Sequence, residues 1–375
     1  MATVEPYETK GGKRYRVRFR IPDGRQTDKR GFRTKREAKE YLAAVEVSKA
    51  RGDYVSPSAS RTRVAELGES WLDRKNVKPS TFRALESAWR VHVEPRWGRT
   101  AIARIEHTAV QDWVSDMRDQ GASATTIKRN VGVLKGILDE AVRDRKLSVN
   151  PCIDITTPRK VPREHVYLTH QQLHRLASEC GEHSTLVLVL GYCGLRWGEA
   201  IGLRVKDVDL ARARLNVQVN AVEVGGDVHV GTPKTHARRS VPFPRGLLGD
   251  RLQSQSRDKL PNALLFPGPD GQHLRRTRTD AKSGGWFAGA VRRADIPRIT
   301  IHDLRHTAAS LAISSHANVK VVQRMLGHES AAMTLNTYSG LFDDDLDAVA
   351  TALDDAGSRF MLPSNINREL RMPTE

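Results

Sequence analysis

Cysteines and long apolar runs are scarce in this 375-residue sequence. Its three cysteines form no C-x-x-C pair, which argues against a disulfide framework and against a cysteine-based zinc site. The longest apolar run, LVLVLGYCGL at 186–195, is far shorter than the roughly 20 residues that span a bilayer. The N-terminal stretch MATVEPYETKGG lacks the apolar segment of a signal peptide. We therefore expect a soluble intracellular protein with no membrane partner.

Acidic residues are also few relative to basic ones. The sequence has 44 Asp and Glu against 61 Lys and Arg, a net charge of +17, which favours a polyanionic partner. Residues 10–36 hold twelve of these cations and only two acids. Within them, RYRVRFRI alternates apolar and cationic residues, as a β-strand with one basic face does. That face carries Arg14, Arg16, Arg18 and Arg20. It predicts a DNA-binding sheet, with an ordinary solvated edge sheet as the alternative.

The pattern changes along the chain, which indicates a multidomain protein. Residues 1–56 combine the basic strand, a turn at PDGRQ, a second basic strand at TDKRGFR and a helix capped by Thr34, so we expect a small α+β domain. Residues 64–150 contain successive stretches with apolar residues three and four apart, which predicts an all-α domain. Ser80 and Ser123 stand where two of its helices should begin.

The remaining sequence mixes helices with one short β-region. Over 212–243, Val alternates with polar residues around Gly225 and Gly226, and this pattern predicts a hairpin. We therefore expect residues 165–357 to form a mainly α domain with a small β-sheet, followed by a C-terminal tail at 358–375.

The stretch ITIHDLRHTAAS at 299–310 permits two interpretations. His302 and His306 lie four residues apart, close to the H-E-x-x-H pattern of zinc proteases. However, Asp303 is one carbon shorter than the Glu of that pattern, and Arg305 would place a fixed cation beside a divalent ion. The same stretch also contains H-x-x-R, which suits a phosphate. The local sequence does not decide between the two.

Four fragments of the last domain share the residue types that phosphoryl chemistry uses. They are GLRWGE with Arg196 and Glu199, TPKTH with Lys234, IHDLRH with His302 and Arg305, and LGH with His328, followed ten residues later by Tyr338. In this order and spacing, over 165–342, they resemble the tyrosine recombinase, or phage integrase, family. The resemblance implies a catalytic domain of the tyrosine recombinase fold.

The resemblance also implies a reaction. Tyr338 would attack a DNA phosphate to form a 3′-phosphotyrosine and release a 5′-hydroxyl. At the matching positions, the family's roles are phosphate binding by Arg196 and Arg305 and a second phosphate contact by His328. Lys234 would protonate the leaving oxygen, and His302 would act as a general acid and base. Glu199 would orient its neighbours. Lys234 could instead be only a phosphate contact, and His306 could support the site or simply pack. No metal and no cofactor are expected.

The resemblance extends to the other domains. Residues 64–150 are similar to the family's helical core-type DNA-binding domain, and residues 1–56 to the arm-type domain of bivalent integrases, such as those of temperate actinobacteriophages. Expected partners are therefore core-type and arm-type attachment sites in double-stranded DNA, a host DNA-bending protein and an excisionase, in the nucleoid of the bacterial cytoplasm.

A homotetramer on DNA is also implied. The acidic segment LFDDDLDAVATALDDAG carries apolar residues at helical spacing, and in the family a C-terminal helix docks on the neighbouring protomer. We expect this role for residues 343–355, with packing on its own domain as the alternative. Three rival functions remain: a transposon-type integrase, a relaxing enzyme similar to type IB topoisomerases, and a non-catalytic DNA-binding protein.

Overall fold

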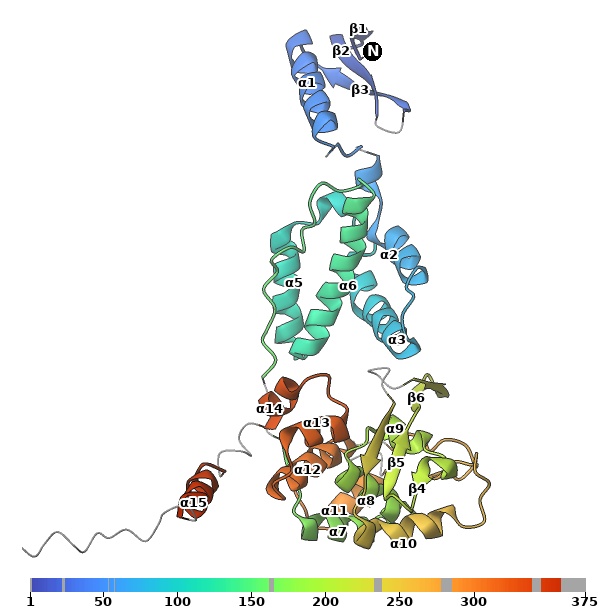
Figure 1. The fold of residues 1–375 in the computed structure, drawn as a ribbon. Helices are drawn as coiled ribbons and strands as arrows, with labels where there is room; N and C mark the ends of the chain where they lie inside the picture. Colours follow the sequence, from blue (N-terminus) through green and yellow to red (C-terminus); the bar gives the residue numbers. More distant parts are fainter. Residues whose placement is uncertain are drawn as a thin grey trace, which may run out of the picture. The chain divides into compact units, whose positions relative to one another are not determined.

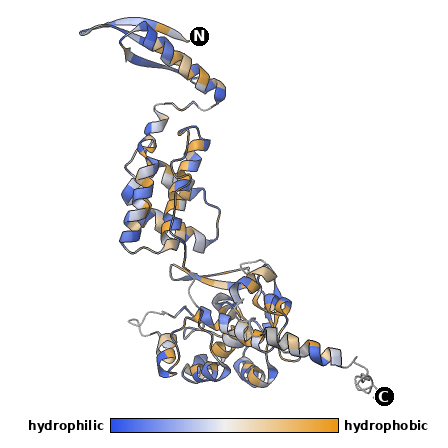
Figure 2. Ribbon diagram, turned by 90° about the vertical axis from the view of Figure 1, so that its left-hand side faces the viewer, coloured by the Kyte–Doolittle hydropathy of each residue, from blue (hydrophilic) through white to orange (hydrophobic). Residues whose placement is uncertain are grey.

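The computed structural model describes residues 2–21, 24–52, 54–56, 58–161, 165–232, 238–277, 285–338 and 345–358. The chain forms two compact units, Met1–Pro162 and Arg163–Glu375 (Figure 1). The buried hydrophobic residues of the described chain gather in three separate cores. Along most helices, hydrophilic and hydrophobic residues alternate around the axis (Figure 2), as helices with one buried face require.

The N-terminal core lies between a sheet and one helix. The antiparallel sheet has the order β1 (Thr3–Thr9), β2 (Gly12–Arg20), β3 (Gln26–Phe32), and α1 spans Lys35–Arg51. Val17 and Phe19 of β2 are buried with Ala38 of α1, and the Thr34 hydroxyl accepts the Glu37 N–H as predicted.

The sheet has one more strand than predicted. Strand β1 gives no clear strand signal in the sequence, because TVEPYET contains Pro6, which cannot donate a ladder hydrogen bond. The structure places β1 at the edge of the sheet, with β2 as its neighbour, and an edge strand tolerates such a residue.

The second core is entirely helical. Its elements are α2 (Val64–Asp73), α3 (Pro79–Ala88), a π-helical turn (Trp89–Val93), α4 (Glu94–Trp97), α5 (His107–Asp119) and α6 (Ala124–Arg143). Ser123 caps α6 as predicted, because its side chain accepts the Thr126 N–H. The prediction for Ser80 is wrong: α3 begins at Pro79, with Lys78 at the N-cap. Proline suits the first helical position, since its fixed φ is helical and no N–H is lost there.

The third core surrounds helix α8. The helices are α7 (His170–Ser178), α8 (Ser184–Cys193), α9 (Trp197–Gly202), α10 (Arg245–Ser256), α11 (Trp286–Arg293), α12 (Ile301–Ser314), α13 (Val319–Leu326), α14 (Ala331–Tyr338) and α15 (Asp345–Ser358). Residues 186–190 of α8 are all buried, because α7, α10 and α12 pack around this helix. The apolar run at 186–195 therefore lies at the centre of a domain core.

Two small sheets flank these helices. Strands β4 (Val208–Asp209), β5 (Arg214–Val217) and β8 (Arg239–Pro242) form one sheet, and β6 (Asn220–Val224) pairs with β7 (Asp227–Gly231) in another. The β6–β7 pair turns at Gly225 and Gly226, which confirms the predicted hairpin. Among the described residues, no helix combines the length and apolarity needed to cross a membrane.

Candidate active site

The site begins at a sharp turn between α8 and α9. Gly194 ends α8 with φ +63°, a left-handed conformation that glycine adopts at no steric cost. A Cβ at this position would lie 2.6 Å from Cδ2 of Leu326. Two residues later Arg196 occupies the N-cap of α9, and its backbone N–H donates to Oε2 of Glu199 at 2.9 Å. The predicted Arg196–Glu199 pair is thus fixed at the start of a helix.

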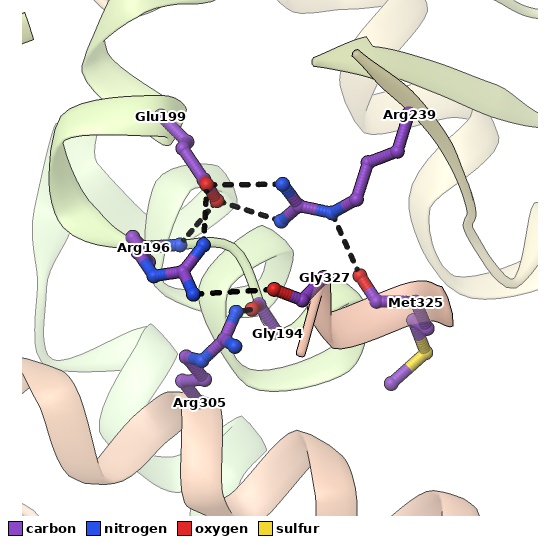
Figure 3. A network of polar contacts seen from close by, with 7 residues as sticks. All are labelled: Gly194, Arg196, Glu199, Arg239, Arg305, Met325 and Gly327. Atoms are coloured by element: carbon purple, nitrogen blue, oxygen red, sulfur yellow. Dashed lines mark hydrogen bonds and ion pairs between the residues drawn. The ribbon is translucent and has the colours of Figure 1, made fainter. Parts of the chain in front are cut away.

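Glu199 lies between two guanidinium groups (Figure 3). Arg196 donates from Nη1 to Oε1 at 2.9 Å, while Arg239 donates from Nη1 to Oε1 at 2.9 Å and from Nη2 to Oε2 at 2.7 Å. The carboxylate is fully buried. Burial alone would raise the pKa of Glu199, but the hydrogen bonds and charge of Arg239, together with Arg196, lower that pKa to about 2. The group is therefore an anion at neutral pH.

Arg305 brings a further guanidinium to the same turn. It extends from α12, is only 3% exposed, and donates from Nη1 to the Gly194 carbonyl at 2.6 Å. Burial and the positive charge of Arg196 lower the pKa of Arg305 to about 9. Two arginines from distant parts of the sequence therefore lie at one turn, an arrangement that can bind a single anion.

His302 faces a pocket next to these arginines. The pocket, of about 280 Å³, is lined by His302, Arg196 and Arg276 together with residues of α9 and β6. Burial and the charge of Arg305 lower the pKa of His302 below its ordinary value, so the imidazole is neutral at pH 7. Arg276 was not predicted as a site residue, because nothing in the sequence distinguishes it from its basic neighbours.

His328 follows α13 and faces the same cationic group. Its Nδ1 lies 2.9 Å from the Thr334 hydroxyl. Burial, together with the charges of Arg305, Arg196 and Arg239, lowers the pKa of His328 to about 4. This imidazole therefore lies beside the arginines in its neutral form.

Tyr338 is the last residue of α14 and is almost completely buried, with 1% exposed. Its hydroxyl lies 2.9 Å from Nδ1 of His306, which gives this second histidine of α12 a direct contact with the predicted nucleophile. Burial raises the pKa of Tyr338 to about 12, although the charge of Arg305 opposes that rise. In this conformation the phenol is protonated and shielded from solvent.

The metal interpretation of α12 does not fit this geometry. Among the described residues, the group with metal-ligand spacing is His165, Asp303 and His306, whose ligand atoms lie within 4.8 Å of one another; it does not include His302 of the zinc-protease pattern. However, the rings of His165 and His306 are stacked, with centroids 4.0 Å apart and planes at 29°, so their in-plane lone pairs do not converge on one ion at ligand distance. Oδ2 of Asp303 accepts hydrogen bonds from the Thr300 N–H and hydroxyl. The acid therefore serves as a helix cap.

Lys234 lies outside the described residues. Arg239 lies five positions further along and starts β8; the sequence showed it only as one of several cations in the predicted hairpin. Its partners Glu199 and Met325 are 40 and 86 positions away, so no local pattern could identify its role.

The arginines of the N-terminal sheet lie where the alternation predicts. Val17 and Phe19 face α1, so the side chains at alternate positions of β2 lie on the other face. Part of this charge is compensated, because Glu5 forms a 2.7 Å ion pair with Arg16 and lies 3.6 Å from Arg18. This acid on the basic face was not anticipated.

Comparison with known proteins now identifies the family. Residues 166–344 match the phage integrase family, and residues 6–49 match an arm DNA-binding domain. The integrase of Mycobacterium phage FRAT1 is 30% identical over 290 residues, covering 74% of this chain and 84% of that protein. The chain belongs to the phage integrase family. The integrase of Mycobacterium phage D29 is 29% identical, over 74% of this chain and 75% of that protein.

Solved structures agree on the fold of this integrase-family chain. The Tn1549 transposon integrase, in complex with a circular intermediate DNA, aligns with a TM-score of 0.62 and 24% identity over 73% of this chain and 94% of that one. A lambda integrase tetramer bound to a Holliday junction aligns with a TM-score of 0.58 and 16% identity, over 87% and 96%. These structures confirm the predicted tyrosine recombinase fold, and the family membership shown above confirms the predicted enzyme class.

Proposed function

We propose that this recombinase cuts and rejoins DNA at attachment sites through a covalent 3′-phosphotyrosine on Tyr338, and so integrates phage DNA. One observation carries the assignment of the site: Arg196 and Arg305 converge at the Gly194 turn, in the same cluster as the Tyr338–His306 pair. A pair of guanidiniums in a buried site suits a phosphodiester whose oxygens gain charge in the transition state.

The proposed roles of the described residues follow from their environments. Tyr338 Oη attacks phosphorus and loses its proton, the phosphorus–O5′ bond breaks, and the 5′-oxygen takes up a proton. His302 is neutral at pH 7, so it can accept a proton as a general base. His328 is held by Thr334 beside the arginines and is the second phosphate-contacting imidazole. Glu199 holds Arg196. Lys234 is the proton donor in this proposal, carried over from the family pattern.

In this conformation the nucleophile Tyr338 is not accessible to DNA. The phenol of Tyr338 is buried and contacts His306, and its pKa of about 12 disfavours the phenolate. Reaction therefore requires α14 to shift so that Tyr338 reaches a phosphate bound by the arginines. There the positive charges would favour the phenolate that attacks.

The proposed DNA partners follow from the two matched domains. We assign core-type sites to the helical and catalytic domains, and arm-type sites to residues 1–56. The active form is a homotetramer on DNA, with residues 343–355 as the segment that docks on a neighbouring protomer; the described part of this segment lies in α15. A DNA-bending host protein and an excisionase complete the assembly, in the bacterial cytoplasm. The domain boundaries 1–56, 64–150, 165–357 and 358–375 are part of this proposal.

A nicked suicide duplex tests the proposal. The duplex carries the crossover sequence of the chain's own attachment site, so that cleavage releases a short strand and traps the covalent intermediate. Wild-type protein should form the protein–DNA adduct in EDTA, and Tyr338→Phe should form none while binding the duplex normally. An adduct with Tyr338→Phe would refute the nucleophile, and loss of the wild-type adduct in EDTA would refute the metal-free reaction.

A further inference from the structure

We propose that Arg239 is a positioning residue of the phosphate site. Arg239 binds both carboxylate oxygens of Glu199 in a bidentate ion pair. Arg196 therefore keeps N–H groups and uncompensated positive charge for the DNA phosphate. This inference rests on the proposed function and deepens it, because it assigns a role to a residue that does not itself touch the substrate.

The hydrogen bonds separate Arg239 from the phosphate-binding arginines. All three guanidinium nitrogens of Arg239 donate to the protein: Nη1 and Nη2 to Glu199, and Nε to the Met325 carbonyl at 3.0 Å. Its side chain is 10% exposed, against 25% for Arg196. Arg196 gives only Nη1 to the carboxylate, and its long 3.4 Å contact with the Gly327 carbonyl is easily exchanged for a stronger acceptor. The guanidinium of Arg239 is thus fully used in contacts within the protein, whereas that of Arg196 can still donate to a phosphate (Figure 3).

The charges support the same division of roles. Arg196 and Glu199 alone would form a neutral ion pair, and such a pair attracts a phosphate weakly. With Arg239 the three side chains carry a net charge of one positive unit, because the buried carboxylate remains ionised between two cations. In a site with little water this difference acts strongly on a developing phosphate charge.

Arg239 also joins three elements that carry the proposed chemistry. It starts β8, reaches Glu199 in α9, and binds the last turn of α13, from which the chain continues to His328. The contact is close, because a Cβ at Gly327 would lie 3.1 Å from the guanidinium carbon of Arg239. The glycine at this position therefore leaves room for the guanidinium group of Arg239.

The experiment compares two scissile groups in the suicide duplex: an ordinary phosphodiester and a methylphosphonate, in which a methyl group replaces one charged oxygen. The neutral methylphosphonate needs less positive charge in the transition state. Arg239→Met should slow adduct formation about 100-fold on the phosphodiester, an effect as large as the loss of one preorganised donor, because Glu199 then neutralises Arg196; the loss on the methylphosphonate should be less than about 5-fold. Arg239→Lys, which keeps the charge, should lie between Arg239→Met and wild type. Arg251→Met on the exposed side of α10 is the matched control and should behave as wild type.

The outcomes separate this inference from the proposed function. Equal losses by Arg239→Met on both substrates would show a purely structural role and overturn the inference, as would an unchanged rate on the phosphodiester. If Arg239→Met does not fold, as judged by circular dichroism, Arg239→Lys decides: equal losses on both substrates again overturn the inference, and a smaller loss on the methylphosphonate supports it. Absence of any adduct from wild-type protein would instead refute the proposed function.

Discussion

At the scale of single residues, Arg305 illustrates a conflict between binding and stability. Its guanidinium is almost completely buried, and among the described residues it donates to a neutral carbonyl, that of Gly194, and forms no ion pair within 4.0 Å. A buried charge without its own carboxylate partner is costly to the folded state, and the lowered pKa of about 9 reflects that cost. A DNA phosphate would supply the missing anion. Glu199 offsets only part of this cost, because it forms its ion pairs with Arg196 and Arg239.

We predict that Arg305→Met strongly slows adduct formation without weakening the fold. Methionine fills a similar volume without charge, so the free energy of unfolding should stay equal or rise by about 1 kcal/mol or more. Cleavage should fall by at least about 100-fold, because a phosphate-binding cation is lost. Urea titration and the suicide duplex measure the two effects. A clear fall in the free energy of unfolding would show that Arg305 serves stability instead.

We predict that the fold loses stability in acid in two overlapping steps. His306 and His328 have pKa values of about 4 in the folded protein, below their ordinary 6.5. As pH falls from about 6.5 to 4, the unfolded chain binds protons that the folded chain does not, so the free energy of unfolding decreases. Glu199, with a pKa of about 2 against an ordinary 4.5, extends the loss below pH 4.5.

Urea titrations between pH 7 and 3 test these steps. The double variant His306→Asn, His328→Asn should show a shallower decrease between pH 6.5 and 4 than wild type. Glu199→Gln should flatten only the lower part of the curve, although it is less stable throughout because two arginines lose their partner. Parallel curves for wild type and the histidine variant would contradict the assignment of the first step.

The residues of the site differ in how far the sequence could predict them. Arg305 and Tyr338 stand in fragments whose order and spacing point to them directly, and the structure brings both into one cluster. The role of Arg239 could not be foreseen, because it depends on contacts with residues far away in the chain. His306 remained ambiguous for the same reason: only the fold places the tyrosine of α14 against it.

At the scale of elements, helix α6 contains two glycines that face different environments. A Cβ at Gly132 would meet nothing within 4 Å, whereas one at Gly136 would lie 2.7 Å from Cζ2 of the buried Trp71. The glycine at 136 therefore permits the close approach of α2, and the one at 132 only weakens the helix.

We predict opposite effects for alanine at these two positions. Gly132→Ala should stabilise the protein by about 0.5–1 kcal/mol, because alanine loses less backbone entropy in a helix. Gly136→Ala should destabilise it by about 1–3 kcal/mol, since the packed tryptophan has to move. Each substitution is the control for the other in the same helix. Thermal unfolding of both variants measures the difference, and equal shifts would refute the role of the Trp71 contact.

Helices could be predicted from the sequence where the spacing of apolar residues and the N-cap residues agree. Helices α1 and α6 begin after Thr34 and Ser123, whose side chains make the expected caps. The start of α3 was missed because proline at the first helical position takes precedence over the following serine. The π-helical turn at Trp89–Val93 leaves no pattern in the sequence, since one wide turn barely alters a helical periodicity.

At the scale of the whole molecule, the positive charge is partly compensated by neighbouring acids. The basic face of the N-terminal sheet carries an acid, Glu5, whose carboxylate is shared by Arg16 and Arg18. The hydrogen bond from Arg16 lowers the pKa of Glu5, so this acid is ionised at neutral pH. It competes with DNA phosphates for the same two arginines, and so it should limit binding to DNA in general.

We predict that the four arginines of this face bind arm-type DNA but do not take part in cleavage. Replacing Arg14, Arg16, Arg18 and Arg20 by Gln in the full chain should weaken binding to an arm-site duplex. It should also lower the slope of log affinity against log salt by up to about 3.6, since each phosphate contact contributes about 0.9. Adduct formation on a core-site suicide duplex should stay within about 3-fold of wild type.

Glu5→Gln should have the opposite effect and strengthen binding of the arm-site duplex, because it frees two arginines. Glu40→Gln is the matched control: Glu40 is an exposed acid on α1, the helix that packs on the other face of the sheet, so its loss should change arm binding much less. Full chains that bridge two differently labelled duplexes, one with an arm site and one with a core site, would report both contacts at once. If the quadruple variant still bridges them at physiological salt, the basic face is an ordinary solvated surface and the arm contact lies elsewhere.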